Sequence, residues 1–321
     1  MEDTGRNQKS GISWHKVVLF LAIGLAALSS MIKELNQVRL LTIEAGQMIS
    51  EWTNALVPTA SARTVVSCRY ISQAQTSSRS DEFRWNGRLS PGQTIEIQGT
   101  NGGVVAEPSN TGEVQVVAIK RARRGDVNTV EVRVVPHAGG VTICAVYPAE
   151  EGGMTPCDPA GSEKPNNSTR TVRNNDVSVD FSVRVPPQVG FVGRTVNGEI
   201  SATGLSSNVS LKTVNGSIKI STSGYAEAST INGEISAKIG DANWPNTLAF
   251  KTLNGGIDLD LPAVLSTDVK AETLNGEINS DFPMTLSGMK DRKKLDGKIG
   301  AGGRELLLKT LNGSINLKRA M

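Results

Sequence analysis

The sequence predicts an all-β fold, a single-stranded β-solenoid preceded by an N-terminal transmembrane or stalk helix. A six-residue motif, T-[VIL]-N-G-x-I, recurs through the C-terminal half, and apolar residues alternate with polar ones on both sides of it. A motif that returns at such intervals is typical of stacked, elongated repeat proteins. The composition agrees: the 321 residues include 33 Gly and only 4% aromatic residues, which suits many tight turns around a thin aliphatic core.

The N-terminal third begins with a basic, polar tail, residues 1–16, which we expect to be cytoplasmic. Residues 17–32 carry no charge. As a helix they would span about 24 Å, slightly less than a hydrocarbon core of about 30 Å. We interpret them as a transmembrane anchor, with a cleaved signal segment as the alternative. Residues 33–62 keep a weak helical spacing of apolar residues and predict a stalk or linker, through which two copies could pair as a homo-oligomer.

The charge on the tail predicts where the remainder of the chain lies. Basic residues before an apolar span favour an inside N-terminus and an exported body. We therefore expect an inner-membrane anchor with the body in the periplasm or outside the cell. If the segment is cleaved, the body is secreted instead.

Residues 63–190 predict the β-rich N-terminal part of the body, because short runs of alternating or continuous apolar residues are separated by turn residues. Cys144 and Cys157 flank a Pro/Gly-rich stretch and are a candidate disulfide, as expected for an exported protein; two free thiols are the alternative. Cys68 is left over. A metal site is not expected, because no second Cys pair or His cluster accompanies these residues.

Residues 191–321 contain the repeats and predict the solenoid proper. The Asn or Asp of successive motifs lies 16 to 22 residues after the one before, and a weaker copy occurs at Asn101. In a solenoid these side chains would stack as a ladder at a repeated corner: Asn197, Asn215, Asn232, Asn254, Asn275, Asp296 and Asn312. The alternative is a stack of β-hairpins with Asn-Gly in two-residue turns. The variable length between copies favours the solenoid.

The residue after Asn-Gly gives a candidate polar binding stripe, formed by Glu199, Ser217, Glu234, Glu277, Lys298 and Ser314. The three glutamates are also the best candidates for carboxylate chemistry, together with Asp258 and Asp260 on one strand. Because Ser, Gly and Lys fill the same position in other copies, outward-facing polar residues on a half-buried sheet explain the pattern equally well. We expect no catalytic residue, no cofactor and no metal. A net charge of +3 over the chain gives no reason to expect nucleic-acid binding.

The repeated T-[VIL]-N-G-x-I, following the alternating strand 177–187, resembles the bacterial putative-adhesin family of β-strand-repeat proteins, which is catalogued largely as a domain of unknown function. The resemblance covers about residues 85–321. It implies an exported, cell-surface β-solenoid, often with an N-terminal membrane segment, and it assigns no chemistry.

These observations favour an envelope-anchored, non-catalytic protein that binds a glycan or a protein partner at the cell surface. Two alternatives remain open. One is a structural or regulatory envelope protein, active in a stress response, that self-assembles. The other is a polysaccharide-processing β-helix enzyme.

Overall fold

The structure is a computed structural model that describes residues 79–150, 152–159, 172, 175–291 and 293–320. The predicted tail, anchor and stalk (1–62) and Cys68 lie outside these residues. Within the described part, no helix is long and apolar enough to cross a membrane. The described residues belong to one compact unit.

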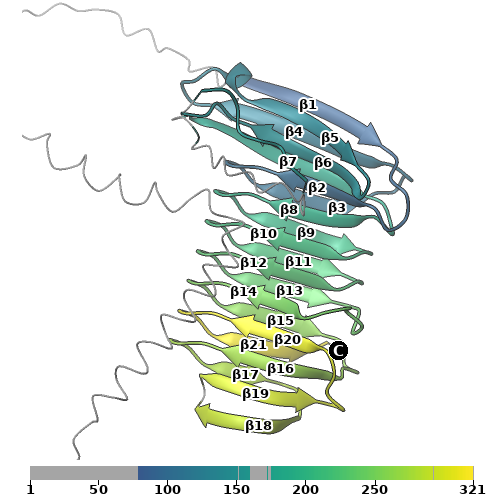
Figure 1. Ribbon diagram of the computed structural model, residues 1–321, viewed down its shortest axis with the longest axis vertical. Helices are drawn as coiled ribbons and strands as arrows, with labels where there is room; N and C mark the ends of the chain where they lie inside the picture. Colours follow the sequence, from purple (N-terminus) through teal and green to yellow (C-terminus); the bar gives the residue numbers. More distant parts are fainter. Residues whose placement is uncertain (1–78, 151, 160–171, 173–174, 292, 321) are drawn as a thin grey trace, which may run out of the picture. The chain divides into compact units, whose positions relative to one another are not determined.

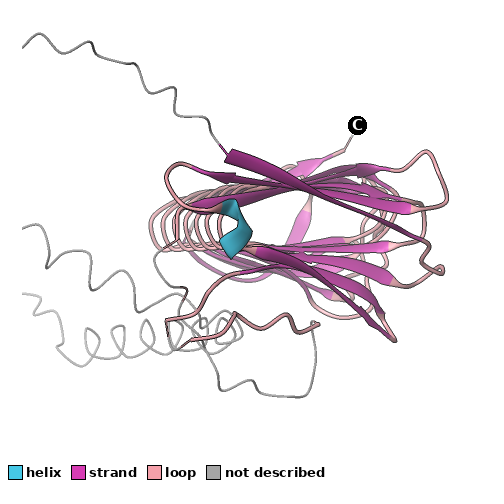
Figure 2. Ribbon diagram, turned by 90° about the horizontal axis from the view of Figure 1, so that it is seen from above, coloured by secondary structure: helices cyan, strands magenta, loops and turns pink. Residues whose placement is uncertain are grey.

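This unit consists of two β-sheets that face each other, as Figure 2 shows. Sheet A contains, in spatial order, β1 (Arg79–Gly87), β4 (Val114–Ala122), β7 (Val177–Val185), β3 (Val104–Pro108), β9 (Ile200–Leu205), β11 (Ile218–Thr222), β13 (Ile235–Ile239), β15 (Ile257–Leu261), β21 (Ile315–Arg319) and β17 (Ile278–Ser280). Sheet B contains β18 (Met284–Asp291), β19 (Lys294–Ile299), β16 (Thr267–Glu272), β20 (Glu305–Lys309), β14 (Leu248–Lys251), β12 (Ala226–Ser229), β10 (Val209–Lys212), β8 (Gly190–Arg194), β2 (Thr94–Gln98), β6 (Gly140–Val146) and β5 (Glu131–His137). One 3₁₀ turn, η3 (Val127–Thr129), follows β4.

The repeats form coils of a solenoid. Each coil has one strand in sheet B, an Asn-Gly corner and one strand in sheet A, and equivalent strands of successive coils pair in parallel, as in β9–β11–β13–β15 (Figure 1). The all-β solenoid is therefore confirmed. The hairpin alternative is wrong, because Asn-Gly joins strands of different sheets.

The core lies between the sheets and is aliphatic. Along most repeat strands alternate residues are buried, so that β10 and β11 contribute Leu211, Ile218 and Ile220 to the core. The inward set changes parity across the corner, because the chain passes from one sheet to the other there. Few large aromatic residues are needed to fill the core between the sheets, although Phe191, Phe250 and Trp244 are fully buried there.

The order of the coils in space differs from their order in sequence at both ends of the stack. The last coil, β20–β21, lies between β14–β15 and β16–β17. The first, β2–β3, lies between β8–β9 and the strands β6 and β7. The first and last coils of the sequence therefore each lie between segments that are nearer the middle of the sequence. Their strands have neighbours on both sides and leave no open edge.

The connection from β19 to β20 explains how the last coil enters the stack. It passes the start of β16, and a Cβ on Gly300 would lie 2.6 Å from Ser266 Oγ and 2.8 Å from Leu265 O. Gly300 also has φ of 59°, in the left-handed region. Only glycine combines that conformation with so close an approach.

Candidate functional site

The Asn-Gly corner, defined as the stacked T-[VIL]-N-G-x segments between the sheets, is the most regular surface feature. The corners of successive coils stack as near-identical loops along one side of the two sheets (Figure 2). The threonine of each motif is buried, and its hydroxyl donates to the carbonyl of the Gly in the adjacent coil. These bonds are Thr195 to Gly102, Thr213 to Gly198, Thr230 to Gly216, Thr252 to Gly233, Thr310 to Gly255 and Thr273 to Gly313, at 2.8–3.0 Å. The threonine therefore fixes the register between coils.

The glycine of the motif is required by close approach of the backbones. A Cβ on Gly198 would lie 2.0 Å from Gly102 O, and one on Gly216 would lie 2.0 Å from Gly198 O. The same contact recurs at the later corners. No side chain fits at that distance, so each copy of the motif keeps a glycine.

The asparagines form a continuous ladder of exposed amides. Each Nδ2 donates to the Oδ1 of the neighbouring asparagine, in the spatial order Asn101, Asn197, Asn215, Asn232, Asn254, Asn312, Asn275, at 2.7–2.9 Å. Asn101, the weak copy of the motif, begins this ladder. Asp296 does not belong to it, contrary to expectation: it lies in β19, which runs antiparallel to β16, so its Asp-Gly is within a strand rather than at a corner.

An aliphatic row lies beside the ladder. It consists of the residue between Thr and Asn in each motif, in the order Val196, Val214, Ile231, Leu253, Leu311 and Leu274. Most of these side chains are partly exposed, and Leu274 at the end is 55% exposed. The corner therefore offers an aliphatic row and an amide row side by side.

The predicted polar stripe flanks the ladder on the sheet A side. Its spatial order is Glu199, Ser217, Glu234, Gly256, Ser314 and Glu277. Lys298 is not part of it, contrary to expectation, because it lies in β19 of sheet B opposite Asp268. Ser217 separates Glu199 from Glu234, and Gly256 and Ser314 separate Glu234 from Glu277, so no two glutamates of the stripe are neighbours. This arrangement avoids like charges on adjacent strands.

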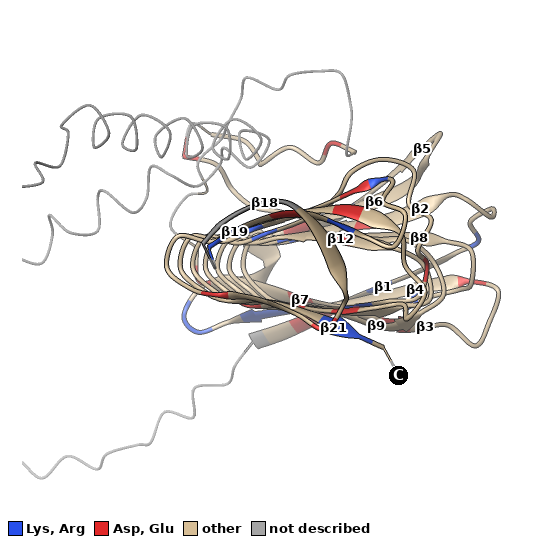
Figure 3. Ribbon diagram, turned by 90° about the horizontal axis from the view of Figure 1, so that it is seen from below, with Lys and Arg blue, Asp and Glu red and all other residues tan. Residues whose placement is uncertain are grey.

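Basic residues flank the ladder on the sheet B side. The residue before the motif threonine is Arg194, Lys212, Ser229, Lys251, Lys309 or Glu272, in spatial order. Glu272 pairs with Lys294 at 2.6 Å and Lys309 at 3.5 Å, and these lysines lower the pKa of its carboxyl group against the opposing effect of burial. Charges of both signs occur on both sheets (Figure 3). Sequence reasoning missed this basic row, although the position before each threonine could have revealed it.

The candidate carboxylates are not brought together. Ser217 separates Glu199 from Glu234. Asp258 accepts a hydrogen bond from Asn316 Nδ2 at 2.6 Å and lies 3.8 Å from Lys318 Nζ. Among the described residues, no three His, Cys, Asp or Glu side chains are grouped so as to hold a metal ion.

Cys144 and Cys157 form a disulfide, with Cα atoms 5.7 Å apart. Cys144 is buried in β6. The bond ties the loop after Tyr147 to β6, the strand that pairs with β2 in sheet B. It therefore stabilises the N-terminal part of the body.

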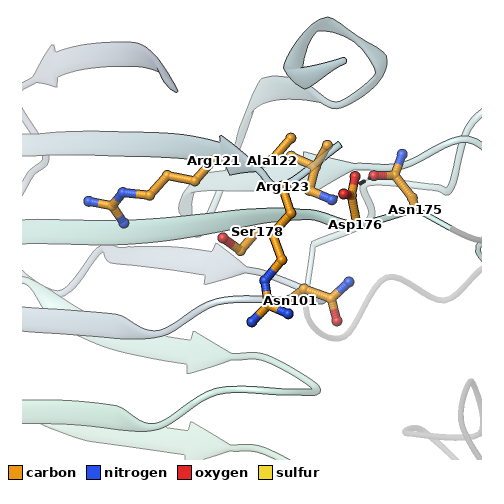
Figure 4. A pocket seen from close by; sticks show the side chains of 8 residues that line it. Asn101, Arg121, Ala122, Arg123, Asn175, Asp176 and Ser178 are labelled. Carbon is orange, nitrogen blue, oxygen red and sulfur yellow. Dashed lines mark hydrogen bonds between the residues drawn. The ribbon is translucent and has the colours of Figure 1, made fainter. Parts of the chain in front are cut away.

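A hollow of about 660 Å³ lies next to the first rung of the ladder, lined by Asn101, Arg121, Arg123, Asp176 and Ser178 among others. In Figure 4, Arg123 extends toward Asn101, whereas Arg121 points away. Arg121 pairs with Asp180. The Asp176 carboxylate accepts N–H bonds from Arg124 at 2.7 Å and from the next residue, which lowers its pKa. The charged groups here thus hold the turn after β4.

The basic run of residues 120–126, at the end of β4, contains a buried lysine. Lys120 is 8% exposed, and its Nζ lies 2.6 Å from Asp81 Oδ2 and 3.3 Å from Val130 O. The ammonium group lowers the pKa of Asp81 by a hydrogen bond and by its charge. Lys120 thereby connects β1 to β4 and to the residue after η3.

The fold and the corner define a two-sheet β-solenoid with a periodic surface. Residues 193–318 match the family model described as Toastrack DUF4097. The family expected from the motif is thereby confirmed for this part of the chain.

Two solved structures match this chain at low identity. A putative cell adhesion protein from Clostridium sporogenes ATCC 15579 is 11% identical, with 75% of this chain and 100% of that chain covered and a TM-score of 0.39. A putative adhesin from Bacteroides fragilis NCTC 9343 is 11% identical, with 75% and 97% covered and a TM-score of 0.27. No curated protein sequence matches significantly.

Proposed function

We propose that the protein is a non-catalytic, envelope-anchored surface protein that binds an extended glycan along the Asn-Gly corner. The observation that supports this is a repeated set of groups: an amide in all seven coils, with an aliphatic side chain beside it in six and a polar side chain after Asn-Gly in five. Seven asparagines give six steps of about 4.8 Å, or about 29 Å. A periodic surface of this length suits a polymer better than a small molecule.

The chemistry of the rows suits sugar hydroxyl groups. An asparagine side chain has two N–H donors and an oxygen with two lone pairs. Within the ladder, Asn215 donates one N–H to Asn197 and accepts one from Asn232. One donor and one acceptor site of each interior rung remain for hydroxyl groups, and the aliphatic row supplies contact for the C–H faces of sugar rings.

Affinity would come from repetition. Each rung contributes one or two hydrogen bonds to solvent-exposed groups, which are individually weak because water competes for them. Linked sugar units that engage several rungs act at a high effective concentration once the first is bound. Weak binding per rung is therefore compatible with firm attachment to a polymer.

Binding to a glycan array, followed by charge reversal, tests the proposal. Glu199→Lys and Glu234→Lys change the polar stripe at the corner, and Glu227→Lys makes the same change on the outer face of β12, where Glu227 accepts a bond from Ser210. We expect the two corner variants to lose binding and Glu227→Lys to retain it. Equal losses in all three variants, or no bound glycan with the unaltered chain, would contradict the proposal.

A second candidate function, assembly of copies end to end, is favoured by β17. Among the strands that the structure describes, β17 is hydrogen-bonded only to β21, so it is an edge strand of sheet A. Open strand edges can pair with another chain. Sedimentation over a range of protein concentrations tests this: growth of the sedimentation coefficient with concentration supports assembly, and a constant value of one chain contradicts it.

A further inference from the structure

We propose that Asn275-Gly276 is a site of spontaneous deamidation, and that the other Asn-Gly corners of the ladder are protected by their neighbouring coils. The modification is independent of the proposed glycan binding. It arises because one motif lies at the end of the stack while the six other rungs lie inside it.

The reaction needs only water. The backbone nitrogen of Gly276 loses its proton and attacks Cγ of Asn275. A new N–Cγ bond forms, the Cγ–Nδ2 bond breaks, and the amide leaves with the proton as ammonia. Water then opens the resulting succinimide at either carbonyl and gives aspartate or isoaspartate, with no change in oxidation state.

The attacking nitrogen is engaged at every interior corner. The N–H of the motif glycine donates to the carbonyl of the next asparagine in the ladder at 2.9–3.0 Å, from Gly102, Gly198, Gly216, Gly233, Gly255 and Gly313. Attack at these corners first requires loss of that bond. Gly276 belongs to β16–β17, the coil at the end of the stack, and no partner for its N–H occurs among the described residues.

The side chain of Asn275 is also held less firmly. Each asparagine between the two ends of the ladder both donates and accepts a ladder bond, so its Cγ is fixed on two sides. Asn275 donates to Asn312 Oδ1 at 2.7 Å, and no further asparagine of the ladder donates to it. Rotation toward the Gly276 nitrogen therefore breaks one ladder bond instead of two.

The chain contains matched controls for local sequence. Asn197, Asn232 and Asn275 are all followed by Gly-Glu-Ile. The intrinsic reactivity of these three sites is therefore closely matched, and any difference in the folded protein reports the contacts between coils. Asn86-Gly87 lies in β1, outside the corner, and is followed by Arg88, so it is not part of this comparison.

The product would weaken the end of the stack. Aspartate or isoaspartate lacks the Nδ2 donor that now bonds Asn312, and it adds a negative charge close to Glu277 in sequence and in space. Isoaspartate also lengthens the backbone at a corner whose register is fixed by Thr273 Oγ1 bonding Gly313 O at 2.8 Å. Loosening should be confined to β16–β17, because coils contact only their neighbours.

Peptide mapping by mass spectrometry tests the proposal on the full chain, incubated folded at mildly alkaline pH, with isoaspartate measured by enzymatic methylation. We expect conversion at Asn275 to be roughly tenfold or more faster than at Asn197 or Asn232, because two additional hydrogen bonds must open at an interior corner. In denaturant the three sites should convert at similar rates. Equal rates in the folded protein, or the same preference for Asn275 after unfolding, would overturn the proposal.

Discussion

Replacing Gly216 by alanine would test the close packing of the corners. The new Cβ would lie 2.0 Å from Gly198 O and 2.5 Å from Gly198 C. Ordinary contacts of carbon atoms begin at about 3.5 Å, so the two coils would have to separate locally by about 1.5 Å. Hydrogen bonds of 2.8–3.0 Å do not survive such a displacement.

The expected cost follows from the bonds that cross this contact. They are Asn215 N to Val196 O at 2.8 Å, Gly198 N to Asn215 O at 3.0 Å, Thr213 Oγ1 to Gly198 O at 3.0 Å and Asn215 Nδ2 to Asn197 Oδ1 at 2.8 Å. At about 1 kcal/mol each, their loss lowers the free energy of unfolding by about 3–4 kcal/mol. Residual crowding would add to this value.

Denaturant unfolding of the variant, followed by circular dichroism, measures the change. Gly112→Ala is the matched control, because a Cβ there meets no atom within 4 Å and its φ is not in the left-handed region. It should alter the free energy of unfolding by less than about 0.5 kcal/mol. The reasoning is refuted if Gly216→Ala is as stable as Gly112→Ala.

Three further predictions concern single interactions. Thr213→Val should lower the free energy of unfolding by about 1–2 kcal/mol, because Gly198 O loses its buried hydroxyl donor; an unchanged unfolding midpoint would argue against a role in register. Replacing both Cys144 and Cys157 by serine should lower it by about 3 kcal/mol through loop entropy, and a reduced sample of the unaltered protein should match the variant. Burial raises the pKa of Tyr147 from 10.0 to about 12, so the unfolded chain releases this proton first and stability should fall between those pH values. When the free energy of unfolding is measured against pH, Tyr147→Phe should lack this fall in stability. A phenolate signal of the folded protein at pH 10 that Tyr147→Phe removes would contradict the raised pKa of Tyr147.

Much of the structure of the repeat region could be predicted from the sequence, because the residues that determine it lie within each short motif. The Thr, Asn and Gly of T-[VIL]-N-G-x-I each make one contact that recurs in successive coils, and the period of the apolar residues identifies the buried face. The weak copy at Asn101 joins the ladder through the same contacts.

The order of the coils could not be predicted in the same way. Lys294–Ile299 looks like one more copy of the motif, yet Asp296 and Lys298 lie in an antiparallel strand beside β16. Pairing of β20–β21 with β14–β15 depends on contacts between residues more than 50 positions apart, such as Asn312 with Asn254, separated by 58. No pattern within one repeat carries that information, so the assignment of Asp296 to the ladder and of Lys298 to the polar stripe was wrong.

The strength of binding as a function of glycan length tests the central claim most directly. If the ligand lies along the corner, calorimetry with a series of N-acetylglucosamine oligomers, or of the sugar selected on the array, should show affinity rising with length. The rise should stop once the oligomer spans the ladder, about 29 Å from Asn101 to Asn275. A monosaccharide that binds as tightly as the longest oligomer would contradict the account, because it would place recognition in a single local site.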